Sequence, residues 1–249
     1  MKRMFKIIGV VLLAIIVIVF CIFLFFMTEG YIDFKQAIKE TPIQVKVEEI
    51  KSKDNYVLLS TLPEDYIDAI VAVEDRRFYY HNGIDLISIA RAVLNDMKGK
   101  ELKEGGSTIT QQLAKNTYFT QSKEIKRKFA EIFMAKELEK NLTKGEIMEL
   151  YINTMYFGNG YYSVKEASKG YFGKEPEDMN FYDCTMLAGI PNAPSIYAPT
   201  NNVELAVQRQ IQVLNKMLRY GYISQEIYNE TVATPYPYHS NLTDKNKEN

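Results

Sequence analysis

The stretch GGSTITQQLAKN, residues 105–116, gathers two glycines, three hydroxyl side chains, two glutamines and a lysine around the start of an expected helix. Thr108 and Gln111 have the spacing of a capping box, which marks a helix N-terminus. Glycine lets backbone N–H groups approach a ligand closely, and helix N-termini favour anions. The stretch therefore predicts either an ordinary capped helix or a helix whose first turn forms part of a polar binding site.

Four further polar-rich blocks surround this stretch and favour a binding site. They read EDRRFYYHNGID at residues 74–85, KRKFAEIFMAKELEK at 126–140, ELYINTMYFGNGYYSVKEASKGYFGK at 149–174 and LAGIPNAPSIYAP at 187–199. Most of the intervening sequence has the apolar spacing and capping signals of helices. We therefore expect a mainly α-helical domain that brings these blocks together.

Residues 7–27 are 21 consecutive uncharged and almost wholly apolar positions. A helix of that length crosses a hydrocarbon layer of about 30 Å, whereas a cleaved signal peptide has a shorter apolar core. Lys2, Arg3 and Lys6 precede the span, so the positive-inside rule places the N-terminus in the cytoplasm. The sequence predicts a single-pass signal anchor in the cell membrane, with the remaining chain on the extracytoplasmic face.

The sequence divides into four parts. Residues 1–27 form the cytoplasmic tip and the transmembrane anchor, and residues 28–60 form a stalk. Within the stalk, Ile43, Val45 and Val47 alternate with polar residues, which predicts a small β-hairpin with residues 56–59. Residues 61–234 form the main domain, beginning at an expected Thr61–Glu64 capping box, and the Pro-, Asn- and Lys-rich residues 235–249 form a disordered tail.

The five blocks, in this order and at these spacings, closely resemble the five motifs of the peptidoglycan glycosyltransferases, which polymerise lipid II into glycan strands. That family occurs as the first domain of bifunctional penicillin-binding proteins and as stand-alone monofunctional transglycosylases. Because S-x-x-K and K-T-G, which a transpeptidase needs, do not occur, we expect the stand-alone kind. The resemblance implies a lysozyme-like helical lobe joined to a small membrane-associated jaw lobe, which we assign to residues 84–97.

The resemblance also implies roles for two carboxylates. Glu74 is expected to be the catalytic base that deprotonates the acceptor hydroxyl of lipid II, although a lone Glu beside Arg76 and Arg77 is more often a surface ion-pair member. Glu131 is expected near the diphosphate of the donor, with a divalent cation such as Mg²⁺ or Mn²⁺. Arg127 and Lys128 lie one helical turn from Glu131, so a solvated salt-bridge face is the plain alternative.

The same resemblance assigns substrate contacts to residues of the first three blocks. The phosphate clamp, defined here as Lys115, Arg127 and Lys128, is expected to hold the departing diphosphate, and Lys123 adds to it. The remaining expected substrate-binding residues are Ser107, Thr108, Gln111, Gln112, Phe78 and His81. For His81 a structural role is an equal alternative, and the aromatic loop of residues 156–162 is either a turn with core residues or a substrate contact.

Two rival functions stay open at this point. A lysozyme-like lytic enzyme also uses a carboxylic acid on a helical lobe, but it needs no clamp for a diphosphate. An inactive membrane scaffold of the cell-wall machinery would be expected to lose Glu74 or Glu131, and both are present. A net charge of −1 argues against a nucleic-acid partner. Expected partners are lipid II, the lipid-linked glycan chain, the bilayer, a penicillin-binding transpeptidase and other cell-wall proteins.

Overall fold

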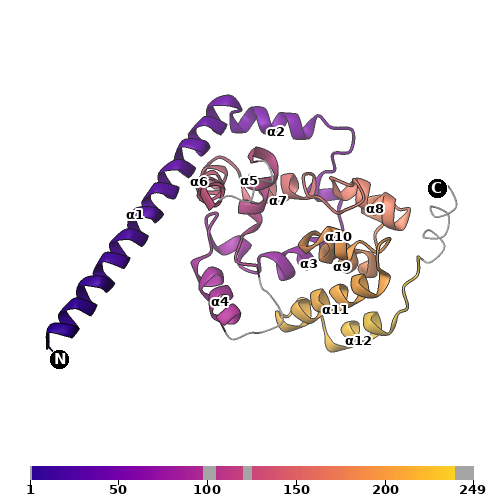
Figure 1. The fold of residues 1–249 in the computed structure, drawn as a ribbon. Helices are drawn as coiled ribbons and strands as arrows, with labels where there is room; N and C mark the ends of the chain where they lie inside the picture. The colour runs from indigo at the N-terminus through magenta and orange to yellow at the C-terminus, as the bar shows by residue number, and fades with distance from the viewer. Residues whose placement is uncertain (1, 98–104, 120–124, 239–249) are drawn as a thin grey trace.

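The computed structural model describes residues 2–97, 105–119 and 125–238, and these residues form helices and no β-strand (Figure 1). The mainly α class expected from the sequence is therefore confirmed. The α-helices are α1 (Lys2–Glu40), α2 (Ile43–Lys51), α3 (Glu64–Glu74), α4 (Leu86–Met97), α5 (Ile109–Tyr118), α6 (Ile125–Asn141), α7 (Lys144–Ile152), α8 (Val164–Phe172), α9 (Phe181–Gly189), α10 (Pro194–Tyr197), α11 (Val203–Arg219) and α12 (Gln225–Ala233). Four short 3-10 helices are η1 (Leu59–Thr61), η2 (Phe78–Tyr80), η3 (Pro176–Asp178) and η4 (Ile190–Asn192).

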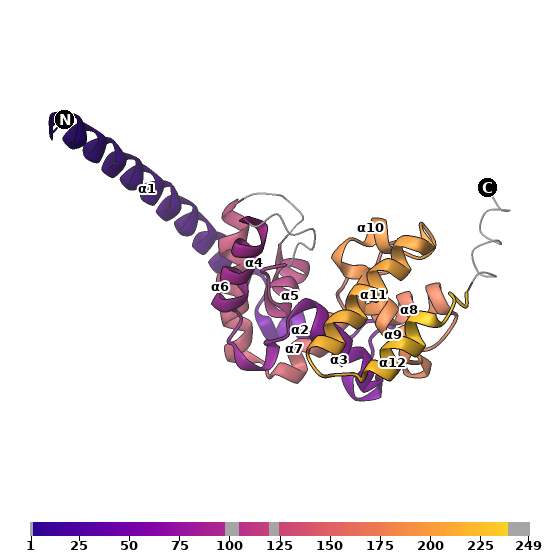
Figure 2. The same ribbon diagram turned by 90° about the horizontal axis from the view of Figure 1, so that it is seen from below.

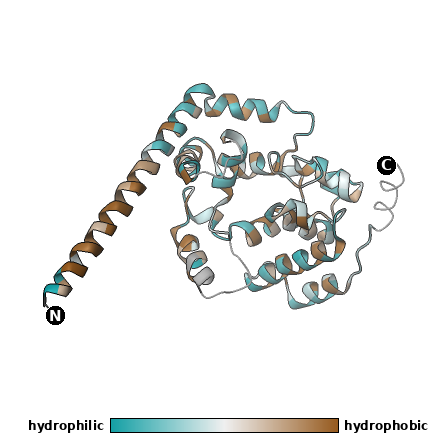
Figure 3. Ribbon diagram, in the orientation of Figure 1, coloured by the Kyte–Doolittle hydropathy of each residue, from teal (hydrophilic) through white to brown (hydrophobic). Residues whose placement is uncertain are grey.

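Helix α1 is one continuous helix that runs away from the body of the molecule (Figure 1). After a polar first turn, most of the N-terminal two thirds of α1 is apolar, as the brown colour in Figure 3 shows, and its most apolar window is 0% buried. By length and composition this helix can cross a membrane. Its polar C-terminal part continues as helix to Glu40 and packs against α6.

The β-hairpin expected in the stalk is wrong. Residues 43–51 form α2, because the apolar residues Ile43, Val47 and Ile50 also recur at helical spacing. Ile43 and Ile50 are buried, whereas Val45, which only an alternating pattern needs, is 56% exposed. The residues expected as the returning strand instead lead into η1.

The core lies around α3, which packs against α9 and α11, while α5 packs against α6 and α7. In Figure 2, α4, α5 and α6 lie on one side of the body and α9 to α12 lie on the other. Helix α4 exposes three large apolar side chains, Leu86, Ile87 and Leu94. This helix is the segment expected to form the jaw, and its apolar surface is available for such a role.

Two boundaries differ from the expectations. The Thr61–Glu64 capping box is absent, because Pro63 is the residue before α3 and Thr61 lies in η1. The expected disordered tail begins too early, because Tyr236 is buried and the Tyr238 hydroxyl donates a hydrogen bond to Asp183. The rest of the expected tail, residues 239–249, lies outside the described residues.

Candidate active site

The start of α5 is fixed by a capping box, as expected. The backbone N–H of Gln111 donates to Thr108 Oγ1 at 3.1 Å, and the backbone N–H of Thr108 donates to Gln111 Oε1 at 3.0 Å. Thr108 Oγ1 also donates to the carbonyl oxygen of Gly83 at 2.8 Å. Thr108 and Gln111 are almost fully buried, so both side chains shape the site from within the fold. Their role as substrate ligands stays a prediction.

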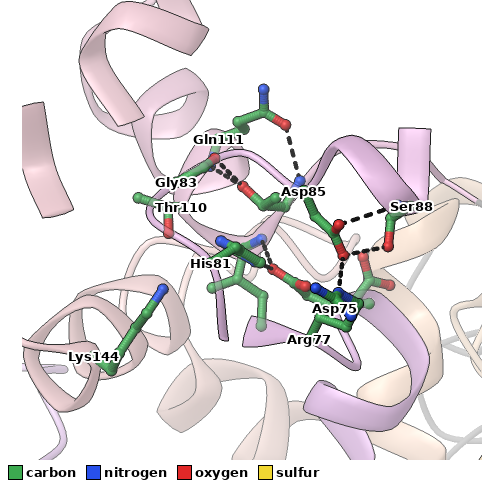
Figure 4. Close-up of polar contacts among 12 residues, drawn as sticks. Asp75, Arg77, His81, Gly83, Asp85, Ser88, Thr110, Gln111 and Lys144 are labelled. Carbon is green, nitrogen blue, oxygen red and sulfur yellow. Dashed lines mark hydrogen bonds and ion pairs between the residues drawn. The ribbon is translucent and has the colours of Figure 1, made fainter. Parts of the chain in front are cut away.

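Asp75, at the end of α3, connects this helix to the first turn of α5. Its Oδ2 accepts a hydrogen bond from the backbone N–H of Ile109 at 3.1 Å and lies 2.8 Å from His81 Nε2 (Figure 4). Phe78 is completely buried beside His81, and the Lys144 ammonium lies 4.4 Å from the centre of the Phe78 ring. Phe78 and His81 are therefore packed supports of the site in this structure. Their direct contact with substrate stays a prediction.

Glu74 is the last residue of α3, so its carboxylate follows the buried run of residues 69–73 and lies at the edge of the core. Its Oε2 accepts a hydrogen bond from Gln112 Nε2 at 2.7 Å. Gln112 Oε1 in turn accepts from the hydroxyl of the buried Tyr151 at 3.4 Å. Gln112 therefore orients the Glu74 carboxylate. Among the described residues Arg77 pairs with Asp85 and Arg76 stacks on the Tyr220 ring, so neither forms the surface ion pair with Glu74 that was the alternative.

Two cations of the phosphate clamp meet on α6. Arg127 Nε lies 3.0 Å from Glu131 Oε1, and Lys128 Nζ lies 3.0 Å from Glu131 Oε2. Lys128 Nζ also donates to Ser107 Oγ at 2.7 Å, which ties α6 to the turn before α5. The Glu131 side chain is 3% exposed, so this is a buried carboxylate and not the solvated salt-bridge face of the plain alternative.

One cleft of about 230 Å³ brings these groups together. It is lined by Glu74 and by Lys115 and Lys128 of the clamp, and further lining residues are Ser107, Gln111, Gln112, Glu131, Pro191, Asn192, Arg209 and Lys216. A second cleft of about 400 Å³ shares Lys115 and Gln112 with it and adds Arg127. The three clamp cations therefore line two neighbouring clefts that share Lys115, and Glu74 lines the first of them. Lys123 lies outside the described residues.

The sequence expectations missed two cations of α11 that also line the first cleft. Arg209 of α11 is 8% exposed and donates from Nε to the Gly189 carbonyl oxygen at 3.2 Å. Burial lowers the pKa of its guanidinium, and the charge of Glu74 acts in the opposite direction. Lys216 Nζ donates to the Val73 carbonyl oxygen at 2.9 Å. A charged residue at position 209, on a face of α11 that is apolar apart from Gln210, was the available signal.

A family model described as Transglycosylase matches residues 40–218, which is more than half of the chain. The chain belongs to the transglycosylase family. A similar relative is the "putative transglycosylase H16_A0665" of Cupriavidus necator, which is 42% identical over 73% of this chain and 78% of its own length. Another is penicillin-binding protein 1A of Aquifex aeolicus, which is 43% identical over 72% of this chain. This chain spans 25% of the length of that second relative.

Among solved structures, penicillin-binding protein 1A of Haemophilus influenzae matches 73% of this transglycosylase chain and 17% of its own chain. The TM-score is 0.42 and the sequence identity is 22%. Membership of the transglycosylase family gives glycosyl transfer as the class of chemistry. In this member the Glu74 carboxylate lines the same cleft as several cationic side chains.

The aromatic loop of this transglycosylase forms a turn, and its direct contact with substrate stays a prediction. Gly158, Asn159 and Gly160 have positive φ angles, and the Phe157 backbone N–H donates to the Tyr161 carbonyl oxygen at 2.8 Å, as in a tight turn. Tyr156 instead lines the second cleft. Ser163 caps α8 with an ordinary extended backbone. The loop is therefore a turn that carries one cleft-lining side chain.

The described residues do not fit a resident metal site. They contain no group of three or more His, Cys, Asp or Glu side chains that could hold a metal ion. Glu131 is a single carboxylate, and each of its oxygens lies 3.0 Å from a cationic side chain. A divalent cation here would have to displace Arg127 or Lys128 and take most of its ligands from the substrate. The expected metal-binding role of Glu131 stays a prediction.

Proposed function

We propose that this chain is a peptidoglycan glycosyltransferase that polymerises lipid II into β-1,4-linked glycan strands. The observation that carries the proposal is the cleft that Glu74 shares with Lys115 and Lys128, next to a second cleft that Lys115 and Arg127 line. Joining sugars from a lipid-diphosphate donor needs a base for the acceptor hydroxyl and cations for the leaving group. Family membership and similarity to proteins named transglycosylase and penicillin-binding protein 1A support the same chemistry.

In the proposed reaction Glu74 is the general base. Its carboxylate takes the proton from the 4-hydroxyl of the acceptor sugar, and that oxygen attacks the anomeric carbon of the lipid-linked chain with inversion. Gln112 donates to one carboxylate oxygen, and among the described residues no hydrogen bond occupies the other, which accepts the proton in a fixed direction. The buried hydroxyl of Tyr151 holds the Gln112 amide in turn.

The phosphate clamp receives the leaving undecaprenyl diphosphate. Lys115 comes from α5, and Arg127 and Lys128 come from α6, so the cations approach from two helices. Glu131 holds Arg127 and Lys128 in place through two ion pairs. Before the donor arrives, the negative charge of Glu131 offsets the repulsion between these two adjacent cations. The donor then brings negative charge of its own. No step of this mechanism passes through a metal ion.

The membrane setting of the proposed reaction follows from α1. Both substrates carry lipid tails, and an anchored enzyme meets them in the same bilayer. We place the N-terminus in the cytoplasm and the catalytic domain on the extracytoplasmic face, from Lys2, Arg3 and Lys6 before the span. A penicillin-binding transpeptidase that crosslinks the product strand is a proposed partner.

Purified full-length protein in liposomes that contain labelled lipid II tests this proposal. The expected product is long glycan that a muramidase digests, together with released lipid diphosphate. A protein that ignores lipid II and shortens preformed glycan strands would be the lytic enzyme. A protein with neither activity, although folded, would be the inactive scaffold.

A further inference from the structure

The C-terminal part of the membrane helix α1 packs along α6, the helix that carries most of the phosphate clamp (Figure 1). Phe23 of α1 makes an edge-to-face contact with Phe129 at 5.2 Å between ring centres. Farther along, Tyr31 and Phe34 both contact the ring of Phe133 at 5.3 Å and 5.9 Å. The contact therefore extends over three helical turns of α1.

Gly30 is the point of closest approach between the two helices. A Cβ atom added to Gly30 would lie 2.5 Å from Phe129 Cβ, 2.6 Å from the Lys126 carbonyl oxygen and 2.9 Å from the Ala130 nitrogen. These distances are shorter than van der Waals contact, so the backbones of α1 and α6 touch here and only glycine fits. By contrast, a Cβ added to Gly9, in the same helix, meets nothing within 4 Å.

The depth of this contact relative to the membrane can be derived from the sequence. The uncharged span ends at Met27. At about 1.5 Å per residue, Gly30 lies roughly 4.5 Å beyond that end and Phe23 roughly 6 Å before it. The headgroup region of a bilayer is roughly 5–8 Å thick on each side. With α1 along the membrane normal, the α6 segment that faces Phe23 and Gly30, which carries Arg127 and Lys128, lies at the depth of the lipid headgroups.

We propose that Gly30 is a positioning residue, through which the membrane helix α1 fixes the phosphate clamp at headgroup depth. The clamp then meets the diphosphate of a lipid whose tail is still in the bilayer, and the lipid need not be lifted out. This proposal rests on the proposed function for its substrate. The positioning itself depends only on the contact between α1 and α6.

The test compares Gly30→Ala with Gly9→Ala in the full-length protein in liposomes. Alanine is the better helix former at both positions, so a loss at position 30 cannot come from a weaker α1. Depth is measured first. The protein has no tryptophan, so Ile125→Trp, at an exposed position at the start of α6, gives a single fluorophore on this helix.

With lipids brominated at shallow or deep positions, we expect shallow quenching to dominate in the Ile125→Trp parent and in its Gly9→Ala derivative. The Gly30→Ala derivative should lose that preference. Identical quenching profiles in all three proteins would overturn the positioning claim, whatever the protein catalyses.

Activity is then measured on two substrates, lipid II embedded in the bilayer and a short-chain, water-soluble analogue. Gly30→Ala should reduce the rate on embedded lipid II by about tenfold and change the rate on the soluble analogue by less than about twofold, since only the first needs the clamp at a fixed depth. Equal losses on both substrates would make Gly30 a purely structural residue and overturn the proposal. A wild-type protein that uses neither substrate would instead overturn the proposed function, while the quenching result would still decide the positioning claim.

Discussion

Replacing Glu131 with glutamine removes one charge from the centre of the phosphate clamp and keeps the shape of the side chain. In the folded protein this carboxylate is 3% exposed, whereas Arg127 is 21% exposed and Lys128 is 46% exposed. Breaking a fully buried ion pair costs about 3–5 kcal/mol, and an exposed pair contributes about 0.2–1 kcal/mol. With a buried carboxylate and partly solvated cations, we expect a loss of about 2 kcal/mol, or roughly 4–8 °C in Tm.

The expected effect of Glu131→Gln on activity is larger than its effect on stability. Without the carboxylate, Arg127 and Lys128 repel each other and turn toward solvent, so the leaving diphosphate meets displaced cations. A displacement of about 1 Å can cost about 100-fold in rate, and we expect a fall of that order in the rate of glycan formation from labelled lipid II. The assay is run on protein shown to be folded at the assay temperature.

Glu137→Gln is the matched control on the same helix. Glu137 pairs with Lys140 at 3.1 Å, but these side chains are 32% and 70% exposed. This variant should stay within about 0.5 kcal/mol of wild type and keep its rate. If Glu131→Gln polymerises lipid II as fast as Glu137→Gln, the clamp does not depend on Glu131 and the argument is refuted. If its rate falls and its response to added Mg²⁺ or Mn²⁺ also changes, Glu131 acts through a metal ion.

Three further predictions concern the fold and the topology. Burial raises the pKa of Asp85, but hydrogen bonds from Ser88 and the charge of Arg77 outweigh burial, so the pKa is lowered. The stability that Asp85 contributes is therefore present above about pH 4 and is lost as the pH falls through the folded pKa. Asp85→Asn should flatten this part of an acid unfolding curve. Gly83→Ala, at φ +82 with its Cβ 2.9 Å from a carbonyl oxygen, should lower Tm by several degrees, whereas Gly145→Ala, with nothing within 4 Å, should not. A reporter enzyme that works only outside the cytoplasm should be active when fused after Asn249, and activity of a cytoplasmic reporter instead would reverse the topology.

Of the two capping boxes expected from the sequence, one is present and one is absent. The Thr108–Gln111 box forms and satisfies two backbone donors within one turn, whereas the Thr61–Glu64 box does not form because Pro63 precedes α3. The β-hairpin predicted from the alternating residues of the stalk is wrong, because apolar residues can match helical and strand periodicity at once over so short a segment. The packing of Ile50 against the core favours the helix over the strand, and the sequence does not show that contact.

The candidate active site was only partly predictable for a related reason. Glu74 and the phosphate clamp could be found because they lie in motifs, and the structure brings them to two neighbouring clefts that share Lys115. Arg209 and Lys216 come from a helix outside those motifs, and only the packing of α11 against α3 brings them to Glu74. The burial of Thr108 and Gln111 likewise depends on the contacts of the whole domain.

The central claim is that Glu74 acts as the base in the polymerisation of lipid II. The most direct measurement compares glycan formation from labelled lipid II by wild type and by Glu74→Gln, with Tm measured on both proteins. Wild type should make muramidase-sensitive polymer that moenomycin, which resembles the lipid-linked donor, suppresses. Glu74→Gln should lose about 10²–10⁴-fold in rate at unchanged Tm, since that is the usual contribution of a general base. Undiminished polymerisation by Glu74→Gln, or a wild type that only shortens preformed strands, would contradict the account.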